Sequence, residues 1–231
     1  MKINNIPSTA IQVDHLTIGY GDHPLVRDIS FEMAPGECVL LAGANGTGKS
    51  TLLKQLAAND IILIPTNIPK VKGFTVESFI HTGCYRESDW RGRISDEAAK
   101  RMEEALDVLG IQELKGRDIS TLSDGEFKKA CLAVGLTRKA EVLLLDEPTA
   151  FLDVENRISV LETLREVARK TGTAVLFSSH DLHDALPVVD RVFALTKDGR
   201  FLVSGPDDKE AVLQAAFNTR IIAYGTPSDH R

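Results

Sequence analysis

A glycine-rich loop between an apolar run and a helix-forming segment constrains this chain more than any other feature. The loop fits the pattern G-x-x-x-x-G-K-[ST] and consists of Gly43, Ala44, Asn45, Gly46, Thr47, Gly48, Lys49 and Ser50. It directly follows the apolar run 38–42, and its glycines let backbone N–H groups turn inward around phosphate oxygens. The pattern therefore predicts a strand, a loop and a helix that together bind the phosphates of a nucleoside triphosphate.

Three side chains at the start of the expected helix carry the chemistry of this loop. Lys49 is expected to reach the β- and γ-phosphates, Ser50 to offer its hydroxyl to Mg²⁺, and Thr51 to add a second hydroxyl nearby. A glycine-rich turn that binds nothing is the alternative, but a strand, loop, lysine and helix in register favour phosphate binding. The motif alone does not separate a kinase from a motor.

Composition and charge limit which kinds of partner and compartment the chain can have. The chain has 231 residues and a formal net charge of −6. Because binding to nucleic acid requires clustered positive charge, a nucleic-acid partner is disfavoured. Cys38, Cys84 and Cys131 share no metal-like spacing and are expected to be reduced thiols. The sequence has neither the pattern of a signal peptide nor the ~18 apolar residues that a membrane span needs. We therefore expect a cytoplasmic protein whose membrane role runs through a partner.

Apolar strands alternate with helices in the second half of the chain. Such continuous apolar strands between helices are typical of a buried, mostly parallel sheet in an α/β fold. Strands are expected at 142–145 and 174–178, with helices at 123–136 and 156–170. The other expected elements are an antiparallel edge at 11–17 and 29–33, a strand at 61–64, helices at 75–81 and 96–109, a strand pair around 198–199 and a short C-terminal helix.

A second strong signal is a strand that ends in two carboxylates. The apolar run 142–145 is followed by Asp146, Glu147 and Pro148. Ligands meet an open parallel sheet at the ends of its strands, so Asp146 is expected to hold Mg²⁺ and Glu147 to orient and deprotonate a water that attacks the γ-phosphate. The alternative is a polar strand end that leads into the Pro148 turn. Such an end commonly has one carboxylate, so the two adjacent carboxylates favour the magnesium and water-activating roles.

The segment 122–126, Leu-Ser-Asp-Gly-Glu, supports two compatible interpretations. Ser123 and Glu126 have the spacing of a capping box before the apolar-periodic run 127–136, so helix initiation alone explains them. A capped helix start with a serine hydroxyl and an exposed Gly125 N–H is also an anion site, which could face a phosphate on another molecule.

These segments stand in a fixed order with two more, Phe-Leu-Asp at 151–153 and Ser-Ser-His-Asp at 178–181. The ordered set resembles the ATP-binding subunit of an ABC transporter, from Tyr20 to about Gly205. The resemblance implies one domain over 1–231: a P-loop core with a mostly parallel sheet, a small antiparallel β lobe and a helical lobe inserted at about 75–138. It also implies a head-to-tail homodimer in which two ATP molecules lie between the phosphate loop of one subunit and the segment 122–126 of the other.

The same resemblance suggests roles for further residues. Tyr20 would stack on adenine, and Ser123 and Gly125 would meet the ATP of the second subunit. His180 would contact the γ-phosphate, and Asp153 would lie at the dimer interface. His180 and His183 could suggest a metal pair instead, but Zn²⁺ usually takes three or four ligands and no further cluster accompanies them. His183 is therefore expected to be a solvated helix residue.

The segment 82–95 is similar to that of importers of iron-siderophore, haem and cobalamin type. This implies a permease in the cell membrane as partner, contacted by residues 67–93, and a periplasmic substrate-binding protein that acts indirectly. Trp90 is expected to anchor the helical lobe to the core. A non-transport ABC ATPase and a P-loop kinase remain as alternatives; the first usually has two cassettes or a coiled-coil insertion, and the second would lack the segment 122–126.

Two departures from the family concern the metal sensor and the β lobe. Thr66, with Asn67 beside it, stands where the family has a glutamine that senses Mg²⁺. The stretch 50–65 is also short, because the usual strand-and-turn insertion is missing, so the antiparallel lobe should be reduced. An aspartate stands at position 124, where most relatives have glycine, and its side chain is expected to point outward or to meet a cation such as Lys128.

Overall fold

A six-stranded sheet forms the centre of the molecule. The structure, a computed structural model, describes residues 9–21, 23–57 and 61–217. The order across the sheet is β4-β5-β6-β3-β7-β8; all neighbours are parallel except β7 and β8, which are antiparallel. The strands are β3 Cys38–Gly43, β4 Ile61–Ile64, β5 Val142–Leu145, β6 Ala174–Ser178, β7 Arg191–Leu195 and β8 Phe201–Val203. Every residue of β3, β5 and β6 is buried, which confirms the mostly parallel, two-sided sheet predicted from the continuous apolar runs.

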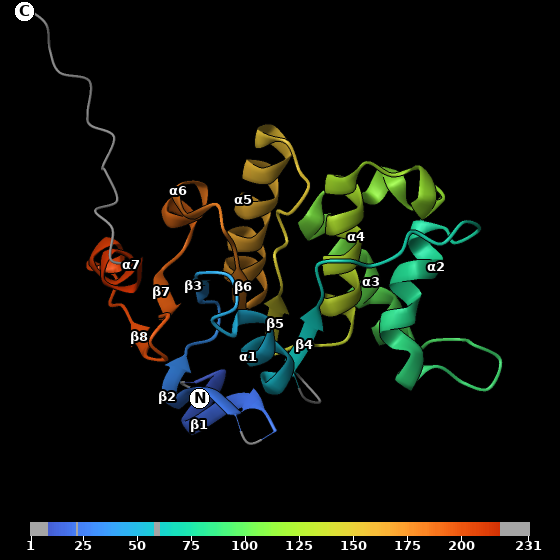
Figure 1. Cartoon of the computed structure of the whole chain (residues 1–231). Coiled ribbons are helices and arrows are strands. Elements are labelled where there is room, and N and C mark those ends of the chain that lie inside the picture. The colour runs from blue at the N-terminus through green and yellow to red at the C-terminus, as the bar shows by residue number, and fades with distance from the viewer. Residues whose placement is uncertain (1–8, 22, 58–60, 218–231) are drawn as a thin grey trace, which may run out of the picture.

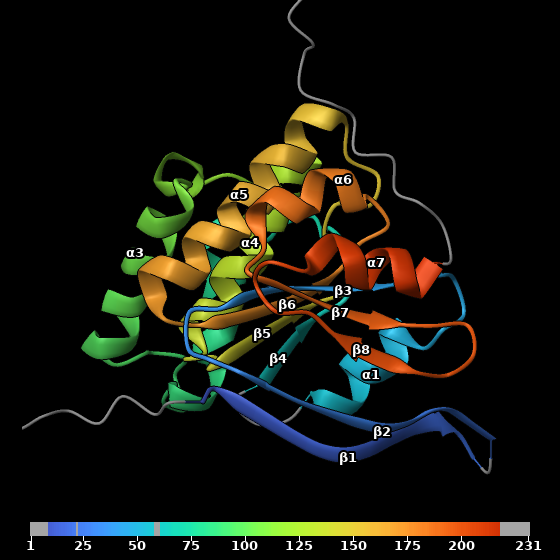
Figure 2. The same cartoon turned by 90° about the vertical axis from the view of Figure 1, so that its left-hand side faces the viewer.

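Each face of the sheet packs on its own apolar core. Side chains such as Leu40 and Leu143 point to the core that the larger helices share, whereas Val39 and Leu144 point to the other face. That second core is closed by α1 Lys49–Leu56 and by two antiparallel strands, β1 Ile11–Tyr20 and β2 His23–Met33. Figure 2 shows β1 and β2 below the sheet and the helices α3 to α7 above it. The remaining helices are α2 Val76–His81, α3 Asp96–Leu109, α4 Asp124–Thr137, α5 Val154–Thr171, α6 Leu182–Ala185 and α7 Lys209–Phe217.

The antiparallel lobe is as small as the short stretch 50–65 predicts. Within the described residues it has two strands, β1 and β2, paired from Ile11 opposite Met33 to Tyr20 opposite His23. Strand β2 begins earlier than the predicted 29–33. The prediction missed its first half because that half is largely exposed and lacks the alternation by which a half-buried strand is recognised.

Three helices, α2, α3 and α4, stand together at one end of the sheet (Figure 1). Helix α3 is capped by the Ser95 side chain and ends at Gly110, whose φ of 61° is left-handed, as its position predicts. Short 3-10 helices at Thr82–Glu87, Gln112–Leu114, Ile119–Thr121 and Leu186–Val188 were not expected from the sequence, since they carry no helical period.

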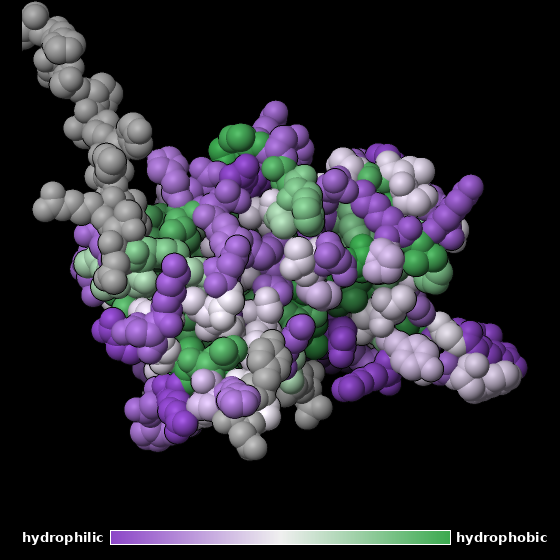
Figure 3. Space-filling model, in the orientation of Figure 1, coloured by the Kyte–Doolittle hydropathy of each residue, from purple (hydrophilic) through white to green (hydrophobic). Residues whose placement is uncertain are grey.

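The expectation that Trp90 anchors this helical lobe is wrong. The side chain is 85% exposed, and its ring packs against the Arg91 guanidinium, with 4.4 Å between the ring centroid and Cζ. Trp90 belongs to the segment between α2 and α3, which projects from the body of the molecule and has a mainly hydrophilic surface in Figure 3. The helical lobe is instead held by packing of α4 against the buried faces of α2 and α3.

The three cysteines are buried and unpaired, as expected. Burial raises the pKa of the Cys38 and Cys131 thiols to about 12, so both stay protonated at neutral pH. None of the helices in the described ranges combines the length and the apolar character that crossing a membrane demands.

Candidate active site

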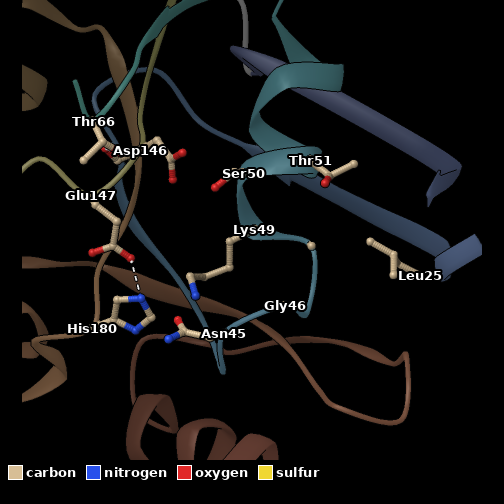
Figure 4. Close-up of a pocket in the computed structure, with 11 residues that line it drawn as sticks. Leu25, Asn45, Gly46, Lys49, Ser50, Thr51, Thr66, Asp146, Glu147 and His180 are labelled. Carbon is tan, nitrogen blue, oxygen red and sulfur yellow. Dashed lines mark hydrogen bonds and ion pairs between the residues drawn. The ribbon is translucent and has the colours of Figure 1, made fainter. Parts of the chain in front are cut away.

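A cleft of about 330 Å³ lies where three neighbouring strands of the sheet end. Strand β3 leads into the phosphate loop, β5 ends before Asp146, and β6 ends before His180. Because β5, β6 and β3 are adjacent and parallel, their carboxyl ends meet at one edge and bring these segments together. The cleft is lined by Leu25, Asn45, Gly46, Gly48, Lys49, Ser50, Thr51, Thr66, Asp146, Glu147 and His180 (Figure 4).

Two glycines of the loop have a backbone that a larger residue would disturb. Gly43 has φ 154°, and a Cβ there would lie 2.6 Å from Thr47 Oγ1 and 2.8 Å from the Leu195 carbonyl oxygen. Gly48 has φ 103° and is the N-cap of α1 without a side chain to cap it. The Thr47 hydroxyl donates to the Ala44 carbonyl at 2.9 Å and so stiffens the loop. The first N–H groups of α1 are therefore left for an anion, as the motif predicts.

Lys49 lies inside the loop and is only 7% exposed. Its ammonium donates to the Gly43 carbonyl at 2.8 Å and lies 3.4 Å from the Ala44 carbonyl. Burial lowers the pKa of this lysine, while the nearby Glu147 and Asp146 carboxylates act in the opposite direction. A cation held this way among backbone carbonyls faces the cleft as a point charge for phosphate oxygens.

Oxygen donors that suit Mg²⁺ meet in the same cleft. Figure 4 shows the Asp146 carboxylate and the Ser50 hydroxyl facing each other across it. Asp146 Oδ1 accepts a hydrogen bond from Ser178 Oγ at 2.9 Å, which orients the carboxylate. The Thr66 hydroxyl donates to the Asp146 carbonyl at 2.8 Å. A carboxylate and a hydroxyl are hard oxygen ligands, so the residues present fit a magnesium ion bound together with a phosphate.

Glu147 is held in an unusual backbone state. Its φ of 50° is left-handed, and its N–H donates to Ser178 Oγ at 2.9 Å. Burial raises the pKa of the carboxyl, while the His180 and Lys49 side chains act to lower it. Oε1 lies 3.0 Å from His180 Nε2; apart from this contact it is buried with no hydrogen-bond partner in the part of the chain that the structure describes. A carboxylate of this kind can accept a proton from a water in the cleft.

Comparison with known families agrees with this geometry. The family model described as "ABC transporter" matches residues 26–150. The chain belongs to the ABC transporter family. The ATP-binding subunits of this family are ATPases, and this chain is accordingly an ATPase that binds a nucleotide.

Curated ABC relatives are similar to most of the chain. The achromobactin transport ATP-binding protein CbrD of Dickeya dadantii is 30% identical, over 91% of this chain and 88% of its own length. The iron(3+)-hydroxamate import ATP-binding protein FhuC of Bacillus subtilis is 29% identical, over 81% and 79%. The zinc import ATP-binding protein ZnuC of Jannaschia sp. is 33% identical, over 80% and 78%. These relatives are ATP-binding subunits of transport systems.

Solved ABC structures have the same fold. The structure of cbiO1 from Clostridium perfringens, part of the ABC transporter complex cbiONQ, superposes with a TM-score of 0.76 at 24% identity. The superposition covers 93% of this chain and 96% of cbiO1. The P-loop core predicted from the sequence is thereby confirmed as an ABC ATPase fold.

Three of the residues that the ABC resemblance singles out lie outside this cleft. Ser123 is the exposed N-cap of α4 in a complete capping box: its Oγ accepts from Glu126 N at 3.2 Å, and its N–H donates to Glu126 Oε2 at 2.7 Å. Asp153 caps α5 by accepting from Asn156 N at 2.8 Å. Gly125 is buried, contrary to the expected exposed N–H, because Asn156 lies over it; a Cβ at Gly125 would be 3.0 Å from Asn156 Oδ1.

Three further positions complete the comparison with the expectations from the sequence. Tyr20 ends β1, but its side chain lies outside the described residues, so its stacking on adenine stays a prediction. Leu25 of β2 lines the cleft and was missed, because a single apolar residue in an exposed strand half gives no sequence signal. His183 is exposed on α6, as expected.

Proposed function

We propose that this chain is the ATP-hydrolysing motor subunit of an ABC importer and works as a head-to-tail homodimer that sandwiches two ATP molecules. The observation that carries the proposal is the division of the site residues. Lys49, Asp146 and Glu147 line one cleft, whereas Ser123 and Asp153 are exposed and do not line it. Exposed residues of a phosphate-facing segment can complete the cleft of a second copy.

Binding of ATP draws on charge. The loop N–H groups, the start of α1 and Lys49 face the triphosphate, and Tyr20 stacks on the base. Ser50 and Asp146 would hold Mg²⁺, which supplies positive charge against the phosphate oxygens when bound. Each subunit has a net charge of −6 and the ATP phosphates add to it, so Lys49, Mg²⁺ and the helix N-termini must offset the phosphate charge before two copies can share the phosphates across the interface. ATP therefore favours the closed dimer.

Hydrolysis uses the two carboxylates differently. Glu147 positions a water in line with the γ-phosphate and accepts its proton, for which the raised pKa suits it. His180, 3.0 Å from Glu147 Oε1, holds that carboxylate and meets the γ-phosphate. Loss of the γ-phosphate removes the group that Ser123 of the second subunit contacts, so the dimer opens.

The helical lobe provides the surface for an integral membrane permease. A groove of about 550 Å³ between α2, α3 and the projecting segment is lined by Glu77, Ser78, His81, Arg93, Ile94, Ala99, Met102 and Glu103. Its mixture of apolar floor and charged rim suits an amphipathic cytoplasmic helix. The subunit is then peripheral on the inner face of the cell membrane and touches a periplasmic binding protein only through the permease.

We infer further that residues 1–231 form one ABC ATPase domain with its helical subdomain at about 75–138, and that the cargo is an iron complex, haem or cobalamin. The cargo rests on the segment 82–95 and on relatives named for iron transport, of which FhuC is one. A zinc importer is also among the relatives, so the uptake test must separate these metals.

The test has three parts. Purified chain should hydrolyse ATP without any phosphate acceptor, which a kinase would need. The Glu147→Gln chain should sediment as a dimer with ATP and as a monomer without it. The subunit drawn from detergent-solubilised native membranes should bring a polytopic permease with it, and a deletion strain should lose uptake of iron chelates but keep zinc uptake. Hydrolysis without a copurifying permease would favour a non-transport ABC ATPase.

A further inference from the structure

The acidic residue at the start of α4 raises an electrostatic problem for the proposed dimer. Asp124 follows Ser123, the residue proposed to meet the phosphates of the second subunit's ATP, and its side chain is 61% exposed. Helix starts favour aspartate, which explains why Asp124 stabilises α4. A carboxylate beside a triphosphate is nevertheless repulsive, and the repulsion grows as water leaves the closing interface.

A lysine from another segment neutralises this carboxylate. Lys70 Nζ lies 2.7 Å from Asp124 Oδ1 and donates to the Leu122 carbonyl at 2.8 Å. It also lies 5.4 Å from the centroid of the Phe127 ring, and its side chain is only 26% exposed. The expected partner, Lys128, is not used: its ammonium donates to the Thr66 carbonyl at 2.8 Å.

The segment that carries Lys70 is fixed where it leaves β4. Thr66 is bonded through its hydroxyl to the Asp146 carbonyl and through its own carbonyl to Lys128. Figure 1 shows the segment running from β4 across α4 towards α2. The Lys70 ammonium is held by its own contacts with the Leu122 carbonyl, the Asp124 carboxylate and the Phe127 ring, so its charge stays next to Asp124.

We propose that Lys70 is a positioning residue, the counter-ion that allows an aspartate to stand in the phosphate-facing segment of this chain. By pairing with Asp124 it removes the repulsion between α4 and the triphosphate held by the second subunit, and it touches no nucleotide itself. The proposal rests on the proposed ATP dimer. It distinguishes Lys70 from a purely structural residue, because the lysine is needed only while the carboxylate is present.

The test measures ATP-dependent dimerisation of the full chain carrying Glu147→Gln, by sedimentation at increasing ATP with Mg²⁺. Lys70→Met keeps the apolar stem and removes the charge, and should raise the ATP concentration for half-maximal dimer by about tenfold. The double variant Lys70→Met with Asp124→Asn should return to within about threefold of the Glu147→Gln chain, because no unpaired charge remains. The deficit of Lys70→Met should shrink at high salt.

Lys100→Met on α3 is the matched control, since it removes a lysine that pairs with Glu104 at 3.7 Å on an exposed surface. It should leave the dimer unchanged. A double variant as impaired as Lys70→Met would overturn the inference, since Lys70 would then act through the Leu122 carbonyl rather than through charge. A harmless Lys70→Met would overturn it as well. Absence of any ATP-dependent dimer in the Glu147→Gln chain would instead contradict the proposed function, and with it the inference.

Discussion

Two features of Glu147, its backbone conformation and the burial of its carboxyl, each cost free energy. Its left-handed backbone, φ 50°, costs on the order of 1 kcal/mol or more for a residue with a Cβ. Its carboxyl is partly buried, which disfavours the charged form. The surroundings that impose both features are the end of β5, the Ser178 hydroxyl and the His180 ring. Strain and desolvation that persist in a cleft of this kind are typical of a reacting group.

Replacing Glu147 by glutamine keeps size and hydrogen bonding but removes the proton acceptor. ATP hydrolysis should fall by about two orders of magnitude or more, while ATP still binds and the dimer persists. Steady-state hydrolysis and equilibrium nucleotide binding check the two halves. Glu141→Gln is the matched control, because Glu141 is exposed directly before β5, at the end opposite to Glu147, and lies outside the cleft. A Glu147→Gln enzyme at the parental rate would remove the residue from its proposed role.

The raised pKa of Glu147 also predicts the pH dependence of hydrolysis. The base works only when deprotonated, so the rate should fall as the pH drops through its pKa, which lies above the ordinary 4.5. His180 acts to lower that pKa, so His180→Gln should move the acid limb of the rate profile to higher pH in addition to slowing hydrolysis. The position of the limb is the readout. An unchanged limb would mean that another group sets it.

At the scale of elements, the segment between β4 and α2 links the residue after β5 in the cleft to α4. Thr66 bonds to the Asp146 carbonyl, Lys128 bonds to Thr66, and Lys70 bonds to Asp124. Where the ABC resemblance implies a glutamine, this chain has a shorter hydroxyl, which donates to the carbonyl of Asp146, the residue proposed to hold Mg²⁺. Asn67 is exposed and lines a neighbouring cleft rather than the nucleotide site.

Thr66 should therefore affect the metal through the residue that it supports. Thr66→Val is close in shape but cannot donate to the Asp146 carbonyl, and should raise the Mg²⁺ concentration for half-maximal hydrolysis by about tenfold. Thr66→Ser keeps the donor and should stay near the parental value. A titration of hydrolysis against Mg²⁺ at fixed ATP distinguishes them. Equal Mg²⁺ dependence in both variants would show that the hydroxyl has no part in metal binding.

How much of this could be predicted from the sequence depends on distance along the chain. The phosphate loop and the carboxylates after β5 are local patterns, and strands and helices with a clear period were found close to their observed ends. The positions of Lys70, Leu25 and Trp90 were not, because each is decided by segments far apart in sequence. An ion pair between residues 54 apart, such as Lys70 with Asp124, has no local signal.

At the scale of the whole molecule, the nucleotide cleft and the groove proposed for the permease lie on different parts of the same fold. The cleft is built on the carboxyl ends of the sheet, and the groove on α2 and α3, which contact α4. Helix α4 begins at the segment proposed to meet the second subunit's ATP and packs against α2 and α3, so it connects that segment to the helices of the groove. An opening of the dimer that moves α4 would therefore move the groove with it.

This arrangement predicts that contact with the permease can be removed without touching hydrolysis. Ala99 is exposed on α3 and lines the groove, so Ala99→Glu adds bulk and charge there at little cost to the fold. Copurification with the permease and iron-chelate uptake should be lost, while the isolated subunit hydrolyses ATP at the parental rate. Ala215→Glu, the same change at an exposed site on α7, is the matched control and should transport normally. Normal uptake with Ala99→Glu would place the permease contact elsewhere on the helical lobe.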